Sequence, residues 1–468
     1  MEKASFFHPI NLCRGIKSLS LLKRCQSAGI EVIMNNLFDI IKNFNSVIWN
    51  WPMLIFLFGT HLFFTFYLKF IQKKIGKGIK LSIAPSESGE GDASSFATLT
   101  TTLAATLGTG NIIGVSTAVA LGGPGAIFWC WLTGVFGMAT TYAECYLGVL
   151  YRKKTKDGTY LGGPMYTLEQ GLHSKGLAVL YCLLTLLASY GIGCSTQSNA
   201  VTETASHLWG VSPYVIGFLT AFVTGLVIVG GLKSIGNICM RLVPAMGGFY
   251  ILACILLLIM NIQYILPAFT LIFRSAFLPQ AVMGGFIGST IKTAARYGIA
   301  RGLFTNEAGL GTAAIAAASG KTKSPKDQAL ISMSATFWDT VIMCAITGLV
   351  IVTNIIGNPE SVEGLSSGEL TTAAFKQIPI IGENMLGISI IAFAIATLIG
   401  WSYFGEKAVE YLFGKNGIGT YRVCYIIMIF VGSILSLEFV WELSDLINAF
   451  MIMPNILSLL LLHRKIKE

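Results

Sequence analysis

The sequence predicts an all-α polytopic membrane protein that crosses the bilayer about eleven times, and three observations lead to this prediction. Hydrophobic residues make up 54% of the 468-residue chain. Charged residues make up only 12%, against about 25% in soluble proteins. Apolar stretches of roughly 20 residues, the length that crosses a bilayer core of about 30 Å, recur along nearly the whole chain.

These apolar stretches also predict how the chain is oriented. The expected spans cover residues 47–68, 94–122, 126–150, 177–207, 213–231, 242–266, 284–319, 328–356, 386–412, 419–437 and 440–462. Lys and Arg concentrate in the loops on one side, such as 69–80 and 152–156. Since basic loops stay in the cytoplasm, we expect the C-terminus inside and the N-terminus outside.

The N-terminal residues disagree with that orientation, because they carry basic residues on the side assigned as exterior: Lys3, Arg14, Lys17, Lys23, Arg24 and Lys42. Either translation begins at Met34, or the first 33 residues are an unstructured extension; they have no apolar segment typical of a signal peptide. The predicted organisation is an extension (1–45), an accessory transmembrane helix (46–70), two repeats (93–266 and 280–462) and a cytoplasmic tail (463–468).

The two predicted repeats share a pattern. "GTGNIIGVSTA" (108–118) and "LFTNEAGLGTAAIAA" (303–317) each place Thr, Asn and several glycines in the first span of a five-span block. The following spans each contain one acid, Glu144 and Asp339. Because five is odd, the second block enters the membrane from the opposite side. Such an inverted repeat with matching Gly-interrupted segments is typical of secondary transporters whose site lies near the midplane.

The glycines in the first segment predict a broken helix, because each costs about 1 kcal/mol against alanine in a helix interior. Irregular backbone is tolerated at membrane depth only where it lines a protein or water cavity. Unwinding at Gly108 to Gly110 would free N–H groups for a carboxylate, and carbonyls near Ala105 to Leu107 for a cation. The alternative is that Gly110 and Gly114 only allow close helix packing.

Several long motifs in order give a specific resemblance over residues 45–462: "ATLGTGNIIGV", "GGPGAIFWCW", "GMATTYAE", "GGPMYTLEQGL", "RGLFTNEAGLGTA" and "GWSYFGEKAVEYLFG". The chain resembles the alanine or glycine:cation symporter family, sodium-coupled carriers of the amino acid–polyamine–organocation superfamily. The resemblance implies a leucine-transporter-type five-plus-five inverted repeat with one additional N-terminal helix. It also implies import of a small neutral amino acid, alanine or glycine, by alternating access.

The resemblance further implies roles for individual residues. The substrate carboxylate is expected at Gly108, Thr109, Gly110 and Asn111, the ammonium near Gln197, and the apolar wall at Phe304, Thr397 and Trp401. Superfamily geometry suggests a sodium site formed by carbonyls at Ala105 and Gly108 with hydroxyls of Thr397 or Ser402, although such hydroxyls also bond back to their own helix. Sodium would be the coupling ion and not a permanent cofactor.

Three buried acids are expected to have structural roles: Glu144, Glu307 and Asp339. Glu144 would accept hydrogen bonds from freed N–H groups near Asn306, with direct cation contact as the alternative. Glu307 would neutralise Arg301 or a backbone end. A proton could instead use Glu144 or Asp339 for coupling, which makes a proton-coupled carrier the main alternative function.

Other functions are less well supported by the sequence. The histidines (His8, His61, His173, His207 and His463) lie near span ends or outside spans without metal-ligand spacing, so an enzyme lacks its usual groups. A channel would need rings of pore-lining acids, and no nucleic-acid motif is present. The expected partners are the amino acid, sodium and membrane lipid, in a bacterial plasma (inner) membrane. The sequence does not predict an oligomeric state.

Overall fold

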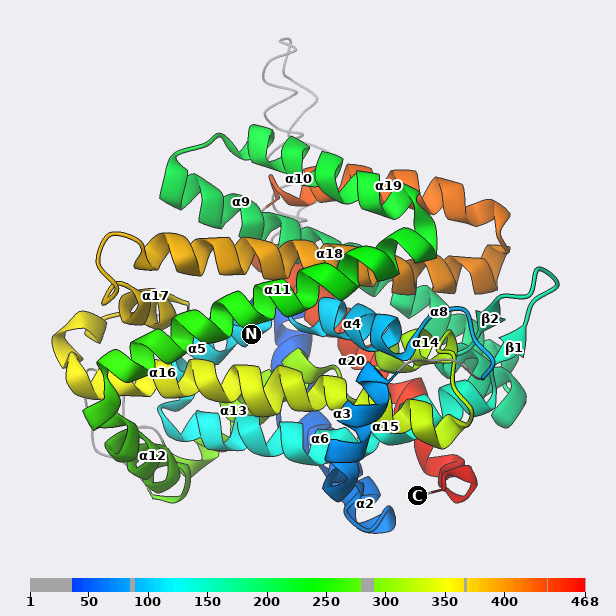
Figure 1. Ribbon diagram of the computed structural model, residues 1–468, viewed down its shortest axis with the longest axis horizontal. Coiled ribbons are helices and arrows are strands. Elements are labelled where there is room, and N and C mark those ends of the chain that lie inside the picture. The colour runs from blue at the N-terminus through cyan, green and yellow to red at the C-terminus, as the bar shows by residue number, and fades with distance from the viewer. Residues whose placement is uncertain (1–35, 85–88, 279–289, 366–367, 436, 468) are drawn as a thin grey trace, which may run out of the picture.

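The computed structural model consists of long helices that mostly run along one common axis (Figure 1). It describes residues 36–84, 89–278, 290–365, 368–435 and 437–467. Most of the expected N-terminal extension, including Met34, lies outside the described residues. The start at Met34 therefore stays a prediction, as do the boundaries of the five predicted segments.

Helices account for most of the described chain. The first part contains α2 (Trp51–Tyr67), α3 (Ile75–Ile83), α4 (Ser95–Thr106), α5 (Ile113–Gly122), α6 (Gly125–Leu150), α7 (Pro164–Tyr166), α8 (Lys175–Tyr190), α9 (Thr196–Trp209), α10 (Pro213–Val229), α11 (Gly231–Met260) and α12 (Ile262–Phe277). The second part contains α13 (Ile291–Asn306), α14 (Thr312–Ala318), α15 (Pro325–Thr336), α16 (Ala345–Gly357), α17 (Glu369–Phe375), α18 (Gly382–Phe413), α19 (Asn416–Gly432) and α20 (Leu437–Leu461).

Shorter elements connect or interrupt these helices. A two-residue antiparallel hairpin pairs β1 (Lys153–Lys154) with β2 (Tyr160–Leu161). Turns of 3₁₀ helix cover Ile71–Lys74, Thr109–Asn111, Pro359–Val362 and His463–Lys465. Turns of π-helix cover Thr167–Gly171, Gly191–Ser195 and Phe337–Cys344. Such π-helical turns are often found at functional sites.

Local sequence accounts for where several of these helices begin. Ser94 Oγ accepts a hydrogen bond from Ala97 N (3.1 Å) at the start of α4, and Ser324 Oγ accepts one from Asp327 N (3.2 Å) at the start of α15. A serine cap satisfies one of the N–H groups that have no partner within the helix. Proline is the first residue of α10 and α15, a position where its missing N–H costs nothing.

The helices identify a multi-pass membrane protein. Among the described residues, six helices are long and apolar enough to cross a bilayer, or up to eight if each of two bent pairs is one span. Shorter apolar helices cover Pro213–Val229, Ile262–Phe277 and Asn416–Gly432. The α13–α14 pair contains Lys292, Arg296 and Arg301 and is less apolar. The predicted total of about eleven spans therefore stays a prediction.

The structure differs from the predicted spans at two places. Helix α2 covers most of the first predicted span, 47–68, but a further helix, Asn36–Ile48, precedes it and meets it at an angle of 46°, because Pro52 starts a new helix after a turn at Asn50. In addition, α12 continues to Phe277, although the predicted span 242–266 ended at residue 266 and a loop was expected to follow. It forms because Ala268 and Ile272 give it a buried face against the bundle.

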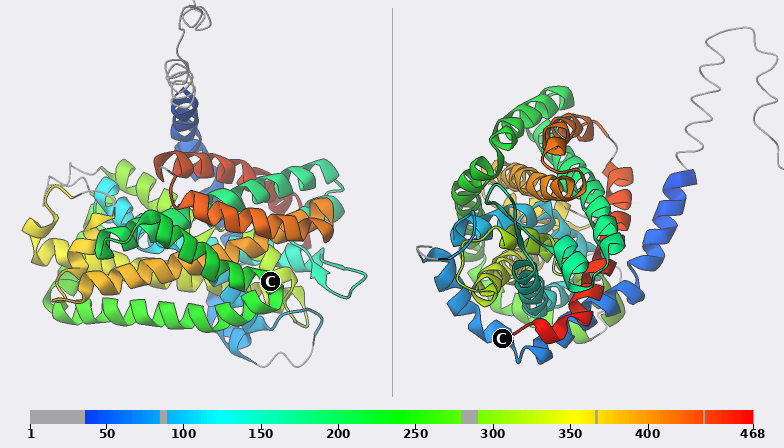
Figure 2. Two further views of the ribbon diagram at one scale, coloured as in Figure 1. Left: turned by 90° about the horizontal axis from the view of Figure 1, so that it is seen from above. Right: turned by 90° about the vertical axis from the view of Figure 1, so that its right-hand side faces the viewer.

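The two broken helices, α4–α5 and α13–α14, lie in the interior of the bundle, as the end-on view in Figure 2 shows. Helix α6 packs against α13 and α15, while α18 and α11 pack against α4. Helices α18 and α4 pack so closely at Gly400 that the β-carbon of any other residue there would lie only 2.6 Å from Ala105 N. This arrangement is the predicted leucine-transporter-type fold, in which both Gly-rich segments face the same centre.

Candidate functional site

The first break separates α4 from α5. Helix α4 ends at Thr106, a 3₁₀ turn covers Thr109–Asn111, and the two halves meet at an angle of 64°. The first hydrogen bond of that turn runs from Asn111 N to Gly108 O (3.3 Å). The N–H groups of Thr109 and Gly110 come before it, so they have no partner within the turn. They form the positive end that can bind an anionic group.

Asn111 holds this break in place through both ends of its amide. Its Oδ1 accepts a hydrogen bond from Gly108 N (3.1 Å), and its Nδ2 donates to Asp339 Oδ1 (2.7 Å). Asp339 lies in the π-helical turn Phe337–Cys344 between α15 and α16, so the bond joins the two repeats. Both ends of the Asn111 side chain therefore have protein partners, which favours a positioning role over direct contact with a substrate.

Gln197 lies beside the same break. It is the second residue of α9, which directly follows the π-helical turn Gly191–Ser195. Its Oε1 accepts a hydrogen bond from Thr109 Oγ1 (3.4 Å), and its Nε2 donates to Ile192 O (3.3 Å). The widened turn exposes the Ile192 carbonyl to this side-chain amide. As a result, the Gln197 oxygen is turned toward the break, where it is available to a cationic group.

Thr397 joins α18 to the end of α4. Its hydroxyl lies 3.4 Å from Leu107 O and 3.1 Å from Phe393 O, so it can donate to either carbonyl. Ser402 behaves differently: its hydroxyl donates to Ile399 O of its own helix (2.7 Å), which is the only hydrogen bond found for it among the described residues. Ala105 packs against Gly400. The structure thus brings Thr397 and a freed carbonyl together, but it does not join Ser402 to them.

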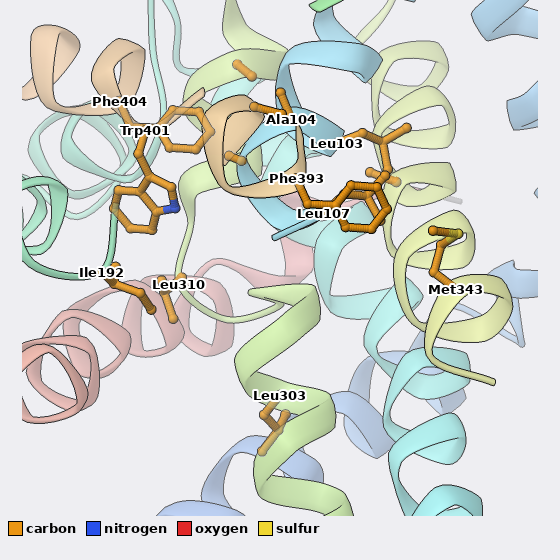
Figure 3. Packing of buried hydrophobic residues seen from close by; sticks show 14 of the residues in the cluster. Leu103, Ala104, Leu107, Ile192, Leu303, Leu310, Met343, Phe393, Trp401 and Phe404 are labelled. Carbon is orange, nitrogen blue, oxygen red and sulfur yellow. The ribbon is translucent and has the colours of Figure 1, made fainter. Parts of the chain in front are cut away.

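Phe304 lies against the first break, and Trp401 follows Thr397 on α18. A β-carbon at Gly110 would lie 3.6 Å from the Phe304 ring, so α13 contacts the first break directly. Phe304 also packs against Trp441, with ring centroids 5.5 Å apart. Trp401, one turn after Thr397 on α18, is completely buried. Figure 3 shows Leu107, Leu310 and Trp401, from the two breaks and from α18, in one buried cluster.

The second break, between α13 and α14, needs unusual backbone angles. Glu307, Gly309 and Gly311 have φ values of 53°, 103° and 86°, in the left-handed region that favours glycine. Gly309 N donates to Glu144 Oε1 (2.7 Å), and Asn455 Nδ2 donates to the same oxygen (2.7 Å). Glu144 thus binds a freed N–H group of the second break.

Glu307 binds side chains from two elements. Its Oε1 accepts a hydrogen bond from Trp401 Nε1 (3.1 Å), and its Oε2 accepts one from Thr312 Oγ1 (2.6 Å). Of the two roles expected for Glu307, neutralising Arg301 or a backbone end, the first has no ion pair to support it among the described residues, and the Arg301 guanidinium lies 5.8 Å from the Phe304 ring centroid. Arg301 lies almost two helical turns before Glu307 on α13, so the two side chains project from different levels of the helix.

Sequence reasoning missed two residues that hold the second break. Asn455 of α20 donates to both Glu144 Oε1 and Gly309 O (2.8 Å), and Tyr181 of α8 donates to Leu310 O (2.8 Å). The sequence offered one indication of a role for Asn455: it is a polar residue in an apolar stretch, next to Pro454, and the structure shows that it is buried. Nothing in the sequence indicates that α20 and α8 meet the second break.

Hydrogen bonds link the two broken helices at the end of the bundle that carries the basic hairpin. Figure 1 shows the β1–β2 hairpin at this end and α17 at the opposite one. Lys321 N donates to Ala93 O (2.7 Å), and Arg152 donates to Glu90 O (2.9 Å) and Gly320 O (3.0 Å). These bonds join the approach to α4 with the residues after α14.

Two interrupted helices that meet in the interior of a membrane-spanning bundle define a secondary transporter with the leucine-transporter-type fold. The chain belongs to the sodium:alanine symporter family, whose model matches residues 34–468. It is 45% identical over 431 residues to the sodium/alanine symporter AgcS of Methanococcus maripaludis, with 91% of this chain and 94% of AgcS covered.

Two further similarities agree with this class. The chain is 31% identical over 441 residues to a putative sodium/proton-dependent alanine carrier protein, YrbD, of Bacillus subtilis, with 91% of this chain and 90% of YrbD covered. The crystal structure of MhsT in complex with L-phenylalanine matches with a TM-score of 0.58 and 17% identity, over 80% of this chain and 89% of MhsT. The match to MhsT shows the shared fold. Family and fold are those of transporters.

Proposed function

We propose that this protein imports alanine or glycine together with sodium, by alternating access, across a bacterial plasma membrane with its C-terminus in the cytoplasm. One observation carries the proposal. At the first break the N–H groups of Thr109 and Gly110 precede the first hydrogen bond of the 3₁₀ turn, and Thr397 Oγ1 lies 3.4 Å from Leu107 O. An amino acid carboxylate suits the N–H groups and a cation suits the two oxygens.

The surrounding residues suit a small zwitterion. Its carboxylate would bind the N–H groups of Thr109 and Gly110, and its ammonium would face Gln197 Oε1. Phe304 and Trp401 would limit the side chain to hydrogen or methyl. Pairing both charges matters, because taking an ion out of water costs several kcal/mol unless it is compensated. The 45% identical relative AgcS is named a sodium/alanine symporter, which supports the same substrate class.

Sodium would bind oxygens, with Leu107 O and Thr397 Oγ1 as the pair that the structure brings together. Coupling to sodium makes accumulation possible. One sodium entering down a potential of about 100 mV gains roughly 2.3 kcal/mol, and a tenfold concentration gradient adds about 1.4 kcal/mol. Together these support accumulation of the amino acid by several hundredfold.

Proton coupling is the second candidate, and a specific observation favours it. Three carboxylic acids, Glu144, Glu307 and Asp339, are buried and in hydrogen-bond contact with the broken helices or with Asn111. Ionisable groups at membrane depth often serve in proton relays. The relative YrbD is named a putative sodium/proton-dependent alanine carrier protein. In our proposal these acids instead hold the backbone of the breaks.

Uptake into liposomes that contain the purified protein tests the proposed function. Labelled alanine and glycine would be supplied with a sodium gradient, a proton gradient, or neither. We expect concentrative uptake of at least one of them with the sodium gradient alone, and inhibition by unlabelled alanine but not by glutamine. Uptake driven only by the proton gradient would contradict sodium coupling. Ion current without any amino acid would indicate a channel instead.

Replacing Thr397 by valine tests the sodium site. Valine keeps the shape of threonine but removes the hydroxyl that lies next to Leu107 O. One hydrogen bond or neutral ligand contributes about 0.5–1.5 kcal/mol to the free energy of binding. We therefore expect the sodium concentration for half-maximal uptake to rise up to about tenfold. Ser402→Ala, which removes a hydroxyl bonded to its own helix, should keep the wild-type value. A reversed pattern would place the ion at Ser402.

A further inference from the structure

Glu307 connects the second break to the wall of the site. Its backbone is left-handed where α13 ends, and its side chain reaches forward to Thr312, the first residue of α14, and across to Trp401 of α18. Glu307 is 6% exposed. Both partners are donors, which matches the carboxylate, an acceptor on both oxygens. The Glu307 side chain therefore ties the end of α13 to the start of α14 and fixes the position of the Trp401 indole relative to the second break.

Apart from this bond, the Trp401 ring is held by packing. A β-carbon at Gly193, in the π-helical turn before α9, would lie 2.4 Å from Trp401 Cβ, so backbone lies directly against the base of the indole. Phe404 meets the ring edge-on, with centroids 5.7 Å apart. Among the described residues, Glu307 is the one hydrogen-bond partner of the indole N–H. The hydrogen bond to the Glu307 carboxylate therefore fixes the orientation of the Trp401 indole.

Trp401 is close to the first break through its own helix. It follows Thr397 by one turn, and Thr397 meets Leu107 O at the end of α4, so residues four apart lie on one face of α18. In the proposed function Trp401 forms part of the wall of the site, so a change in the orientation of its ring would change the space for a substrate side chain.

We propose that Glu307 is a specificity-determining positioning residue: by holding the Trp401 indole against the second break, it restricts the pocket to side chains no larger than methyl. The inference rests on the proposed function, because it concerns the same site and an amino acid substrate. Glu307 acts through Trp401 and Thr312 and does not touch the substrate. It therefore controls which amino acid fits and does not supply a binding group.

Three variants separate this role from a general effect on folding. Glu307→Leu removes both acceptors. Glu307→Gln keeps Oε1 for the indole and can donate from Nε2 to the Thr312 hydroxyl. Thr312→Val keeps the shape of Thr312 but removes one of the two hydrogen bonds that position the carboxylate. The measured quantity is the ratio of the inhibition constants of valine and alanine against uptake of labelled alanine into liposomes.

We expect Glu307→Leu to lower the ratio of the valine and alanine inhibition constants by about tenfold or more. A hydrophobic pocket discriminates by about this factor between side chains that differ by one methylene group. Glu307→Gln should stay near the wild-type ratio, and Thr312→Val should shift it in the same direction as leucine but less. A purely structural role would lower total uptake and leave the ratio unchanged. That result in Glu307→Leu, or in Thr312→Val if the leucine variant does not fold, would overturn the proposal.

Measurements on the wild-type protein distinguish failure of the proposed function from failure of the inference about Glu307. If it neither transports nor binds alanine, the proposed function fails and the inference fails with it. If it transports alanine and Glu307→Leu, or Thr312→Val if the leucine variant does not fold, keeps its valine-to-alanine ratio, the inference alone is overturned.

Discussion

Replacing Gly108 by valine is expected to reduce alanine uptake at least about a hundredfold, equivalent to roughly 2.7 kcal/mol. A β-carbon there would lie 2.8 Å from Thr397 Oγ1 and 3.6 Å from Gln197 Oε1. The branched side chain would therefore occupy the space between the first break, α9 and α18. Initial rates of labelled alanine uptake, at equal amounts of purified protein in liposomes, give the measurement.

The matched control is Gly248→Val in α11, where no atom lies within 4 Å of an added β-carbon. It makes the same chemical change within a long helix of the same repeat. We expect its uptake to remain within about twofold of wild type, as for substitutions that create no clash or cavity. Wild-type uptake by Gly108→Val would show that this part of the first break does not line the substrate site.

Replacing Glu144 by alanine is expected to destabilise the protein strongly. The substitution leaves Gly309 N and Asn455 Nδ2 without their shared acceptor. Each buried polar group that loses its partner costs about 1–3 kcal/mol. The expected result is a clearly lower midpoint of thermal unfolding in detergent, because the second break loses the contact that fixes it to α6.

Glu203→Ala is the control, since Glu203 is an exposed acid on α9. Its midpoint should match that of wild type. Asn455→Ala should lower the midpoint too, and the double variant Glu144→Ala/Asn455→Ala should lose less than the two single changes added together, because the residues share one contact. Full additivity, or an unchanged midpoint for Glu144→Ala, would contradict the role of Glu144 in holding the second break.

Local backbone chemistry made the two breaks predictable from the sequence. Three glycines and an asparagine within 108–114, and the run around Gly309 and Gly311, are too costly for an uninterrupted helix at membrane depth. The same glycine pattern at equivalent positions of two five-span blocks predicted the inverted repeat. These inferences depend on neighbours along the chain, which the sequence displays directly.

Contacts between distant segments could not be predicted in the same way. The bond from Asn111 to Asp339 joins residues 228 positions apart, and the partners of Glu307 lie on two different helices. The π-helical turn before Gln197 has no separate sequence signal, because it inserts a residue into an otherwise regular helix. The expected ion ligand Ser402 bonds to its own helix, an alternative that hydroxyls in membrane helices always have.

The central claim is that the interrupted backbone of the first break binds the amino acid in the interior where the two broken helices meet. An experimental structure of the protein with alanine and sodium tests this most directly. We predict density for alanine between the two breaks, with its carboxylate within hydrogen-bond distance of the N–H groups of Thr109 and Gly110. Alanine bound elsewhere, or residues 104–115 and 303–312 forming uninterrupted helices with packed side chains between them, would contradict the account.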